Sequence, residues 1–380
     1  MRKLIEITLL LSSIILYVGC ANSTKKGGTV GDFFANTDTL EINYAKGFTV
    51  VKKGNINFVE INDLSKSNAN HYKYALVPKG SATDSIPKEY TIIRTPIERV
   101  ICMTTLQLSS LIKLDATDRV VGLTSTKYLH NKKVKSRLES GEIRRIGIEG
   151  EFDVELVMDS KPELIFISPF KRGGYSGITD CGITTFNYLG YKEQSPLGQA
   201  EWIKLMGIMF GIEERANNIF NEVESNYIRL KNSCKNISNR PKVMSGEIHS
   251  GNWYVVGGKS YLAQIFRDAG ADYFMENDSE SGGFYVDYES VYAQGYNADY
   301  WRIVNSHNGE YNYDVLLASD SRYSDFKSFK EHGVIYCNLR DTPFYEKTPM
   351  EPDVVLADLI KVFHPELLPD YEPYFYKLLK

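Results

Sequence analysis

The chain has little cysteine and none of the short motifs that mark common enzyme sites. Five cysteines are spread over 380 residues without a C-x-x-C pair, which excludes the usual zinc-binding and thiol-redox signatures. Gly257-Gly258 lacks the Walker pattern of a phosphate loop, and the adjacent Ser306-His307 lacks a nucleophile elbow. The sequence leaves disulfide pairing open for Cys102, Cys181, Cys234 and Cys337, although we expect Cys102 and Cys234 to be buried thiols.

A strong excess of charge of one sign is also missing. The formal net charge is −4 and no polybasic run occurs, so we do not expect nucleic acid as a partner. A hydrophobic content of 43% and a charged content of 24% are typical of a folded globular protein. Tyrosine, in contrast, is abundant, with 26 residues beside 18 Phe and 3 Trp. Its apolar face and polar tip suit a wet binding surface.

Long apolar runs are absent except at the N-terminus. Residues 2–20 begin with two cations, continue as an apolar run and end in Gly19-Cys20. This run is typical of a signal peptide rather than a membrane span. A cysteine directly after it indicates a lipoprotein with Cys20 as the acylated first residue, although ordinary secretion remains the alternative. We therefore expect the chain to act outside the cytoplasm, on the periplasmic side, and to contact the membrane only through this lipid.

Strands alternate with helices over most of the remaining sequence. Short β-like runs at 48–51, 57–61 and 72–77 predict a small antiparallel appendage. From residue 97, apolar strands alternate with amphipathic helices, which predicts parallel sheets with helical crossovers. A long amphipathic stretch to about Cys234 separates two such halves. The predicted fold class is α/β, with two Rossmann-like lobes joined by one long backbone helix, plus the N-terminal β appendage.

We expect six segments along the chain. They are the signal peptide (1–19), a tether (20–39), the β appendage (40–95), the N-terminal lobe (96–197), the interlobe helices (198–238) and the C-terminal lobe (239–380). Two lobes of this kind form a cleft that faces the carboxyl ends of their strands.

Several stretches carry a family resemblance. They lie at 96–106, 114–123, 152–157 and 161–166 in the first half, and at 257–271 and 286–291 in the second. In this order they resemble the class III solute-binding proteins of ABC importers, the helical-backbone binders of cobalamin, ferric siderophores and haem. The resemblance covers about residues 90–370. It implies a largely preformed cleft, no catalytic step and an ABC permease dimer as partner.

The resemblance also implies one acidic docking residue at the tip of each lobe, facing basic pockets on the permease. The matching positions are Glu155 in Asp-Val-Glu-Leu and Glu289 in Asp-Tyr-Glu-Ser. Each begins a predicted helix, where a carboxylate also relieves unpaired backbone amides. Helix-start preference alone is therefore the alternative explanation.

Candidate ligand-binding residues lie on loops that leave the strand ends. Aromatic side chains there suit a flat macrocycle or a catecholate, because they bury apolar area at a small entropy cost. The expected set is Thr104, Thr105, Lys127, Tyr128, Phe170 and Arg172 in the first lobe, and His249, Trp253, Tyr254, Phe284, Tyr285 and His307 in the second.

The histidines allow two interpretations. His249 and His307 follow strands of the second lobe, where imidazole can ligate haem iron, but hydrogen-bonding surface histidines are the alternative. Binders of free Zn²⁺ or Mn²⁺ use histidines and carboxylates from both lobes, and His130 is the nearest first-lobe candidate. We therefore expect no metal site and no cofactor. The solute can equally be haem, a ferric siderophore or a corrinoid.

The expected function is that of a monomeric, lipid-anchored solute-binding component of an ABC importer. It would capture a small-molecule metal complex in the interlobe cleft and deliver it to the permease. Two alternatives remain open. One is an exported tetrapyrrole chelatase-like enzyme that uses His249, His307 and Glu247, and the other is an accessory lipoprotein of an outer-membrane receptor.

Overall fold

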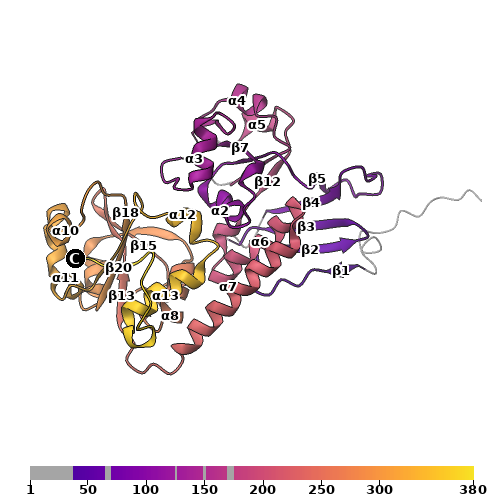
Figure 1. Ribbon diagram of the computed structural model, residues 1–380. Coiled ribbons are helices and arrows are strands. Elements are labelled where there is room, and N and C mark those ends of the chain that lie inside the picture. The colour runs from indigo at the N-terminus through magenta and orange to yellow at the C-terminus, as the bar shows by residue number, and fades with distance from the viewer. Residues whose placement is uncertain (1–36, 65–69, 125, 149–150, 169–174) are drawn as a thin grey trace, which may run out of the picture. The chain divides into compact units, whose positions relative to one another are not determined.

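The computed structural model describes residues 37–64, 70–124, 126–148, 151–168 and 175–380 (Figure 1). The predicted signal peptide, Cys20 and the tether up to residue 36 lie outside these ranges, as do Phe170 and Arg172. No helix in the described ranges combines the length and the apolarity that crossing a bilayer requires.

The N-terminal appendage is a five-stranded sheet with the order β1-β2-β3-β4-β5. Alternation sets its buried face, since Phe48 and Val50 are buried and Thr49 between them is exposed. The turn between β2 and β3 contains Gly54 at φ +61°, a conformation that glycine adopts without a Cβ penalty. β4 and β5 run parallel, so the sheet is mixed rather than wholly antiparallel as expected. The strands are β1 (Asp38–Thr39), β2 (Phe48–Lys53), β3 (Ile56–Asn62), β4 (His71–Pro78) and β5 (Thr91–Thr95).

The first lobe contains a parallel sheet with the order β12-β11-β6-β7-β8. Strands β6, β7 and β11 are buried along their whole length, as expected when helices cover both faces. A small hairpin, β9 with β10, follows β8. The elements are β6 (Val100–Cys102), α2 (Thr105–Lys113), η1 (Thr117–Arg119), β7 (Val120–Leu123), α3 (Lys132–Glu139), β8 (Arg144–Arg145), β9 (Gly147–Ile148), β10 (Glu151–Phe152), α4 (Val154–Asp159), β11 (Leu164–Ile167), α5 (Ser176–Thr179), β12 (Thr185–Asn187) and η2 (Gly190–Lys192).

The second lobe repeats this plan with the sheet order β16-β13-β18-β19-β20, in which only β20 runs antiparallel to its neighbour. A separate antiparallel sheet, β14-β15-β17, was not expected from the sequence. The elements are β13 (Lys242–Ser245), β14 (Glu247–His249), β15 (Asn252–Val256), α8 (Tyr261–Asp268), β16 (Asp272–Tyr273), β17 (Gly283–Val286), α9 (Tyr288–Gly295), β18 (Tyr300–Asn305), α10 (Tyr313–Ser319), η3 (Ser321–Asp325), α11 (Lys327–Lys330), β19 (Val334–Asn338), α12 (Phe344–Lys347), α13 (Pro352–Phe363), η4 (Pro365–Leu367) and β20 (Lys377–Leu378).

Two consecutive helices, α6 (Pro196–Phe210) and α7 (Glu213–Ser233), connect the lobes. Helix α7 has 21 residues and is therefore about 31 Å long. It packs against α6 and against α13 of the second lobe (Figure 1). Near its C-terminus, the hydroxyl of Tyr227 donates to Asp268 of α8 at 2.8 Å. The predicted fold class, two α/β lobes joined by a long helix, is confirmed.

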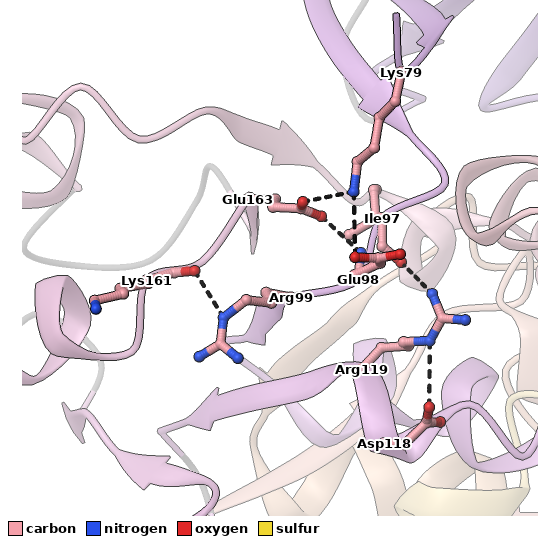
Figure 2. A network of polar contacts seen from close by, with 8 residues as sticks. All are labelled: Lys79, Ile97, Glu98, Arg99, Asp118, Arg119, Lys161 and Glu163. Atoms are coloured by element: carbon pink, nitrogen blue, oxygen red, sulfur yellow. Dashed lines mark hydrogen bonds and ion pairs between the residues drawn. The ribbon is translucent and has the colours of Figure 1, made fainter.

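A polar network joins the N-terminal sheet to the first lobe (Figure 2). The Nζ of Lys79, which follows β4, lies 2.7 Å from Glu163 and 3.6 Å from Glu98. The other carboxylate oxygen of Glu163 accepts the backbone N–H of Glu98 at 2.7 Å. Because Glu98 and Arg99 precede β6 and Glu163 precedes β11, the network lies at the amino ends of these strands, opposite their carboxyl edge.

Two buried carboxylates hold the chain segment that precedes β2. Glu201 of α6 is fully buried and accepts backbone N–H groups from residues 43–45 at 2.7–3.0 Å. Glu193 is 4% exposed and accepts from residues 46–47 and from the indole N–H of Trp202. A carboxylate can stay buried only with such partners. The N-terminal sheet is therefore an integral part of the folded unit.

The cysteines that the sequence left open are all free thiols, and Cys102 and Cys234 are buried as expected. Burial raises the pKa of both thiols. Cys337 is also buried, and Cys181 is partly exposed.

Candidate functional site

The carboxyl ends of the first-lobe strands border a cavity. Thr104 and Thr105 follow β6, Lys127 and Tyr128 follow β7, and Ser168 follows β11. This is the edge at which open parallel sheets bind ligands. The sequence rule that placed candidate residues after strand ends therefore identified four side chains of one cavity.

Local structure fixes the start of α2 at this edge. The side chain of Thr104 accepts the backbone N–H of Gln107, whose side chain in turn accepts the N–H groups of Met103 and Thr104. This reciprocal capping box satisfies the first amides of the helix. It also presents Thr104 and Thr105 to the cavity in a defined orientation.

The first cavity has a volume of about 920 Å³, which is at the upper end of the range for small-molecule sites. Hydroxyl groups are frequent among its lining residues. Those from the first lobe include Thr104, Thr105, Thr124, Thr126, Tyr128 and Ser168, and they are joined by Tyr191 of η2 and by Tyr345 of α12 in the second lobe.

The described charged residues that line the first cavity are both cations. Lys127 and Arg145 are among the described residues that line it, and no aspartate or glutamate is among them. Both cations are exposed. No described carboxylate lies within ion-pair distance of either. Lys127 places its Nζ 5.0 Å from the ring centroid of Tyr128. The described lining therefore contributes positive charge to the cavity.

Tyr128 connects the two lobes at the rim of this cavity. Burial acts to raise the pKa of its hydroxyl, but hydrogen bonds with Lys127 and Ser306 outweigh burial and lower the pKa. Its ring centroid lies 5.8 Å from that of Tyr345. Ser306 and Tyr345 belong to the second lobe and Lys127 to the first, so Tyr128 has contacts with both lobes.

A buried carboxylate of the second lobe binds the first lobe beside this rim. Glu346 of α12 is 3% exposed, and its Oε1 accepts the backbone N–H groups of His130 and Asn131 at 2.6 and 3.1 Å. An ion pair between Lys113 and Glu351 at 2.9 Å adds a second contact. These contacts join the two lobes beside the first cavity.

A second cavity of about 500 Å³ adjoins the first. Leu106, Tyr191 and Tyr345 line both. The second cavity is bordered by Arg302 of β18 and by Leu64, which follows the last strand residue of β3.

The residues predicted in the second lobe lie elsewhere. Trp253 is fully buried in the lobe core, where its ring contacts Trp301 at 5.4 Å and its N–H donates to the Ser245 carbonyl. It was predicted as a cleft residue, but strand alternation in β15 turns it inward. Tyr254 and Tyr285 lie on paired strands with exposed rings 5.3 Å apart, and Phe284 lies beside Tyr285 in β17. None of these four is among the residues lining either cavity.

The two histidines are also outside the lining of both cavities. His249 ends β14 with its ring 6.5 Å from that of Tyr254. The backbone N–H of His307 donates to the side chain of Asn338, and its ring lies 5.2 Å from that of Tyr311. In the part of the chain that the structure describes, no three His, Cys, Asp or Glu side chains form a group able to hold a metal ion.

Several of the described cavity residues were missed by sequence reasoning, and three of them illustrate why. Tyr345 lies on the four-residue helix α12, beyond the loop that directly follows β19, so the rule for loops after strands did not reach it. Arg145 belongs to the two-residue strand β8, too short for its alternation to be recognised. Arg302 lies in the interior of β18, so the rule that searched loops after strands passed over it.

The two predicted docking residues occupy equivalent local positions. Glu155 and Glu289 are both exposed and both lie in the first turn of a helix, α4 and α9. Each helix has an aspartate N-cap, Asp153 or Asp287, whose side chain accepts a backbone N–H three residues later.

Comparisons with known proteins define the class to which this architecture belongs. Residues 100–339 match the family model described as periplasmic binding protein, and the chain belongs to this family. The N-terminal sheet lies before the matched region.

Individual relatives agree with this assignment. The chain is 25% identical to the uncharacterized lipoprotein MJ0878 of Methanocaldococcus jannaschii, over 99% of this chain and 96% of the relative. A periplasmic binding protein from Veillonella parvula has a similar fold, with a TM-score of 0.59 and 14% identity over 80% of this chain and 98% of that one. S. aureus IsdE, solved in complex with heme, gives a TM-score of 0.54 and 19% identity over 70% and 98%. At these identities the solved structures establish the fold alone.

Proposed function

We propose that this protein is the lipid-anchored, extracytoplasmic solute-binding component of an ABC importer, and that its solute is a bulky metal complex that carries an anionic group. Haem, a ferric siderophore and a corrinoid are the candidates. The observation that carries the proposal is the first cavity. It lies at the strand edge where open parallel sheets bind ligands. Lys127 and Arg145 are the charged residues among its described lining, which includes no carboxylate.

The lining residues of the first cavity would make three kinds of contact with such a solute. Lys127 and Arg145 supply positive charge for an anionic solute. The threonine and tyrosine hydroxyls offer hydrogen bonds of either direction. The faces of Tyr191 and Tyr345 provide apolar area for a large ring or chelate. Because Glu346 and Tyr128 already join the lobes, little ordering is required on binding, which favours affinity.

Delivery of the solute to the permease would involve the exposed first turns of α4 and α9. In this proposal Glu155 and Glu289 face basic pockets of a permease dimer, one from each lobe. MJ0878 is named a lipoprotein, which supports the prediction that Cys20 carries the membrane anchor.

One experiment tests the proposal against the chelatase alternative. The full-length protein is purified in detergent from its native host, and the bound solute is identified by mass spectrometry and visible absorbance. A stoichiometric metal complex supports the proposal. The purified protein is then incubated with haemin. Release of free porphyrin over many turnovers would contradict the proposal and favour a chelatase.

A further inference from the structure

The second cavity is built from parts of the chain that are distant in sequence. Leu64 lies in the turn after β3 of the N-terminal sheet, Tyr261 in α8, and Phe344 in α12. It meets the first cavity at Leu106 and Tyr345, so a solute in the first cavity can extend into it. Its lining is largely apolar and aromatic, which makes any charged group there significant.

Among the described residues that line the second cavity, three side chains are charged, and two of them already have protein partners. Lys192 forms an ion pair with the buried Asp63 at 2.7 Å. Glu193 is 4% exposed, and its oxygens accept hydrogen bonds from the backbone of residues 46–47 and from Trp202. Neither group is available to a solute without losing these contacts.

Arg302 differs from Lys192 and Glu193 in that its hydrogen-bond partner carries no charge. Its Nε and Nη2 both donate to a single neutral acceptor, the hydroxyl of Tyr376, at 3.0 and 2.7 Å. The guanidinium carbon lies 5.2 Å from the ring centroid of Tyr376 and 6.0 Å from that of Phe344. No described carboxylate lies within ion-pair distance of it. A guanidinium has five N–H donors in a planar fork that suits a carboxylate or phosphate.

We propose that the second cavity is a subsite for an anionic arm of the solute, a carboxylate or a phosphate, and that Arg302 is its counter-charge. The metal-bearing body of the solute occupies the first cavity, and the arm passes Leu106 and Tyr345 to reach Arg302. This inference rests on the proposed function and narrows the solute to complexes with a pendant anion. Arg302 is a specificity-determining residue in this arrangement, and its stacking on Tyr376 holds the fork in place.

The test uses three matched pairs of probes that differ in a pendant anion. They are haemin and haemin dimethyl ester, cobinamide phosphate and cobinamide, and the ferric complexes of N-succinyl- and N-acetyl-desferrioxamine B. Affinities for the full-length protein are measured by titration calorimetry. For every pair of probes that binds, we expect the member with the pendant anion to bind at least about tenfold more tightly. A charge-assisted hydrogen bond between Arg302 and the anion would give a difference of this size.

Variants then assign the preference to Arg302. R302M is expected to bring the ratio of the two affinities close to one, because it weakens binding of the anionic member more than binding of the member without the pendant anion. R302K is expected to retain part of the preference. R229M is the control, because Arg229 is an exposed arginine of α7 that lines neither cavity. If R302M does not fold, judged by its thermal unfolding, R302Q replaces it.

The outcomes separate this inference from the proposed function. If no probe binds, the proposed function fails and the subsite fails with it. If probes bind but neither member of a pair is preferred, the solute-binding role stands and the subsite is wrong. A preference that survives in both R302M and R302Q would also overturn the assignment of Arg302.

Discussion

Glu155 and Glu289 occupy the same position of two different helices, the second residue after an aspartate N-cap. Asp153 accepts the N–H of Leu156 at 3.0 Å, and Asp287 accepts the N–H of Ser290 at 2.7 Å. Helix α4 belongs to the first lobe and α9 to the second. The two lobes thus present the same acidic group in the same local frame, as two-point docking requires.

Reversing both charges tests docking. The double variant E155K/E289K is expected to abolish solute uptake by the native host and to leave the affinity of the purified protein for the solute unchanged, because neither residue lines a cavity. E214K is the matched control, since Glu214 is also an exposed carboxylate at the second position of a helix, α7. A fall in solute affinity without loss of uptake per bound solute would rule out the docking role.

Removing either cation of the first cavity tests its preference for anions. K127M and R145M are each expected to weaken haemin binding about tenfold, because each removes a charge-assisted contact. The measurement is a titration followed by visible absorbance at low salt. K132M serves as control, since Lys132 is exposed on α3 and lines neither cavity. Equal affinities of K127M, R145M and K132M would show that the cavity is not an anion site.

Shortening Glu346 tests whether the lobes are held together in advance. E346A removes an acceptor that two backbone N–H groups share, and it should destabilise the protein by about 2 kcal/mol. E346Q keeps one acceptor oxygen and should lose less. Amide hydrogen exchange at residues 130–131 is expected to accelerate in E346A. Unchanged exchange there would mean that this contact does not hold the lobes.

Acid should weaken the attachment of the N-terminal sheet. Burial acts to raise the pKa of Glu163, but hydrogen bonds from the Glu98 N–H and from Lys79 outweigh it, so the pKa lies below the ordinary 4.5. A carboxyl whose pKa is lower in the folded state stabilises the protein above its unfolded pKa, and this contribution is lost as the pH falls through the folded value.

The variant E163Q isolates this effect. It should be less stable than the wild type near neutral pH, and the difference should shrink as the pH falls below about 4.5. Urea unfolding followed at a series of pH values measures the difference. E139Q is a suitable control, since Glu139 is an exposed carboxylate of α3 outside this network. A stability difference that stays constant with pH would contradict the proposed role of Glu163.

Local patterns in the sequence were sufficient for the fold class and for part of the site. The strand over Lys242–Ser245 and the helix over Tyr261–Asp268 follow from short-range periodicity and capping, which depend on neighbouring residues alone. The carboxyl-end rule for parallel strands placed Thr104, Thr105 and Lys127 at one cavity.

The tertiary structure alone decided which second-lobe residues meet the first lobe. Trp253 and Tyr254 are neighbours in sequence, yet alternation in β15 buries one in the core and exposes the other. Tyr345 reaches the first cavity because α12 lies against α2, and Arg302 lines the second cavity from the interior of β18. Such positions depend on contacts between segments hundreds of residues apart, and no local pattern encodes them.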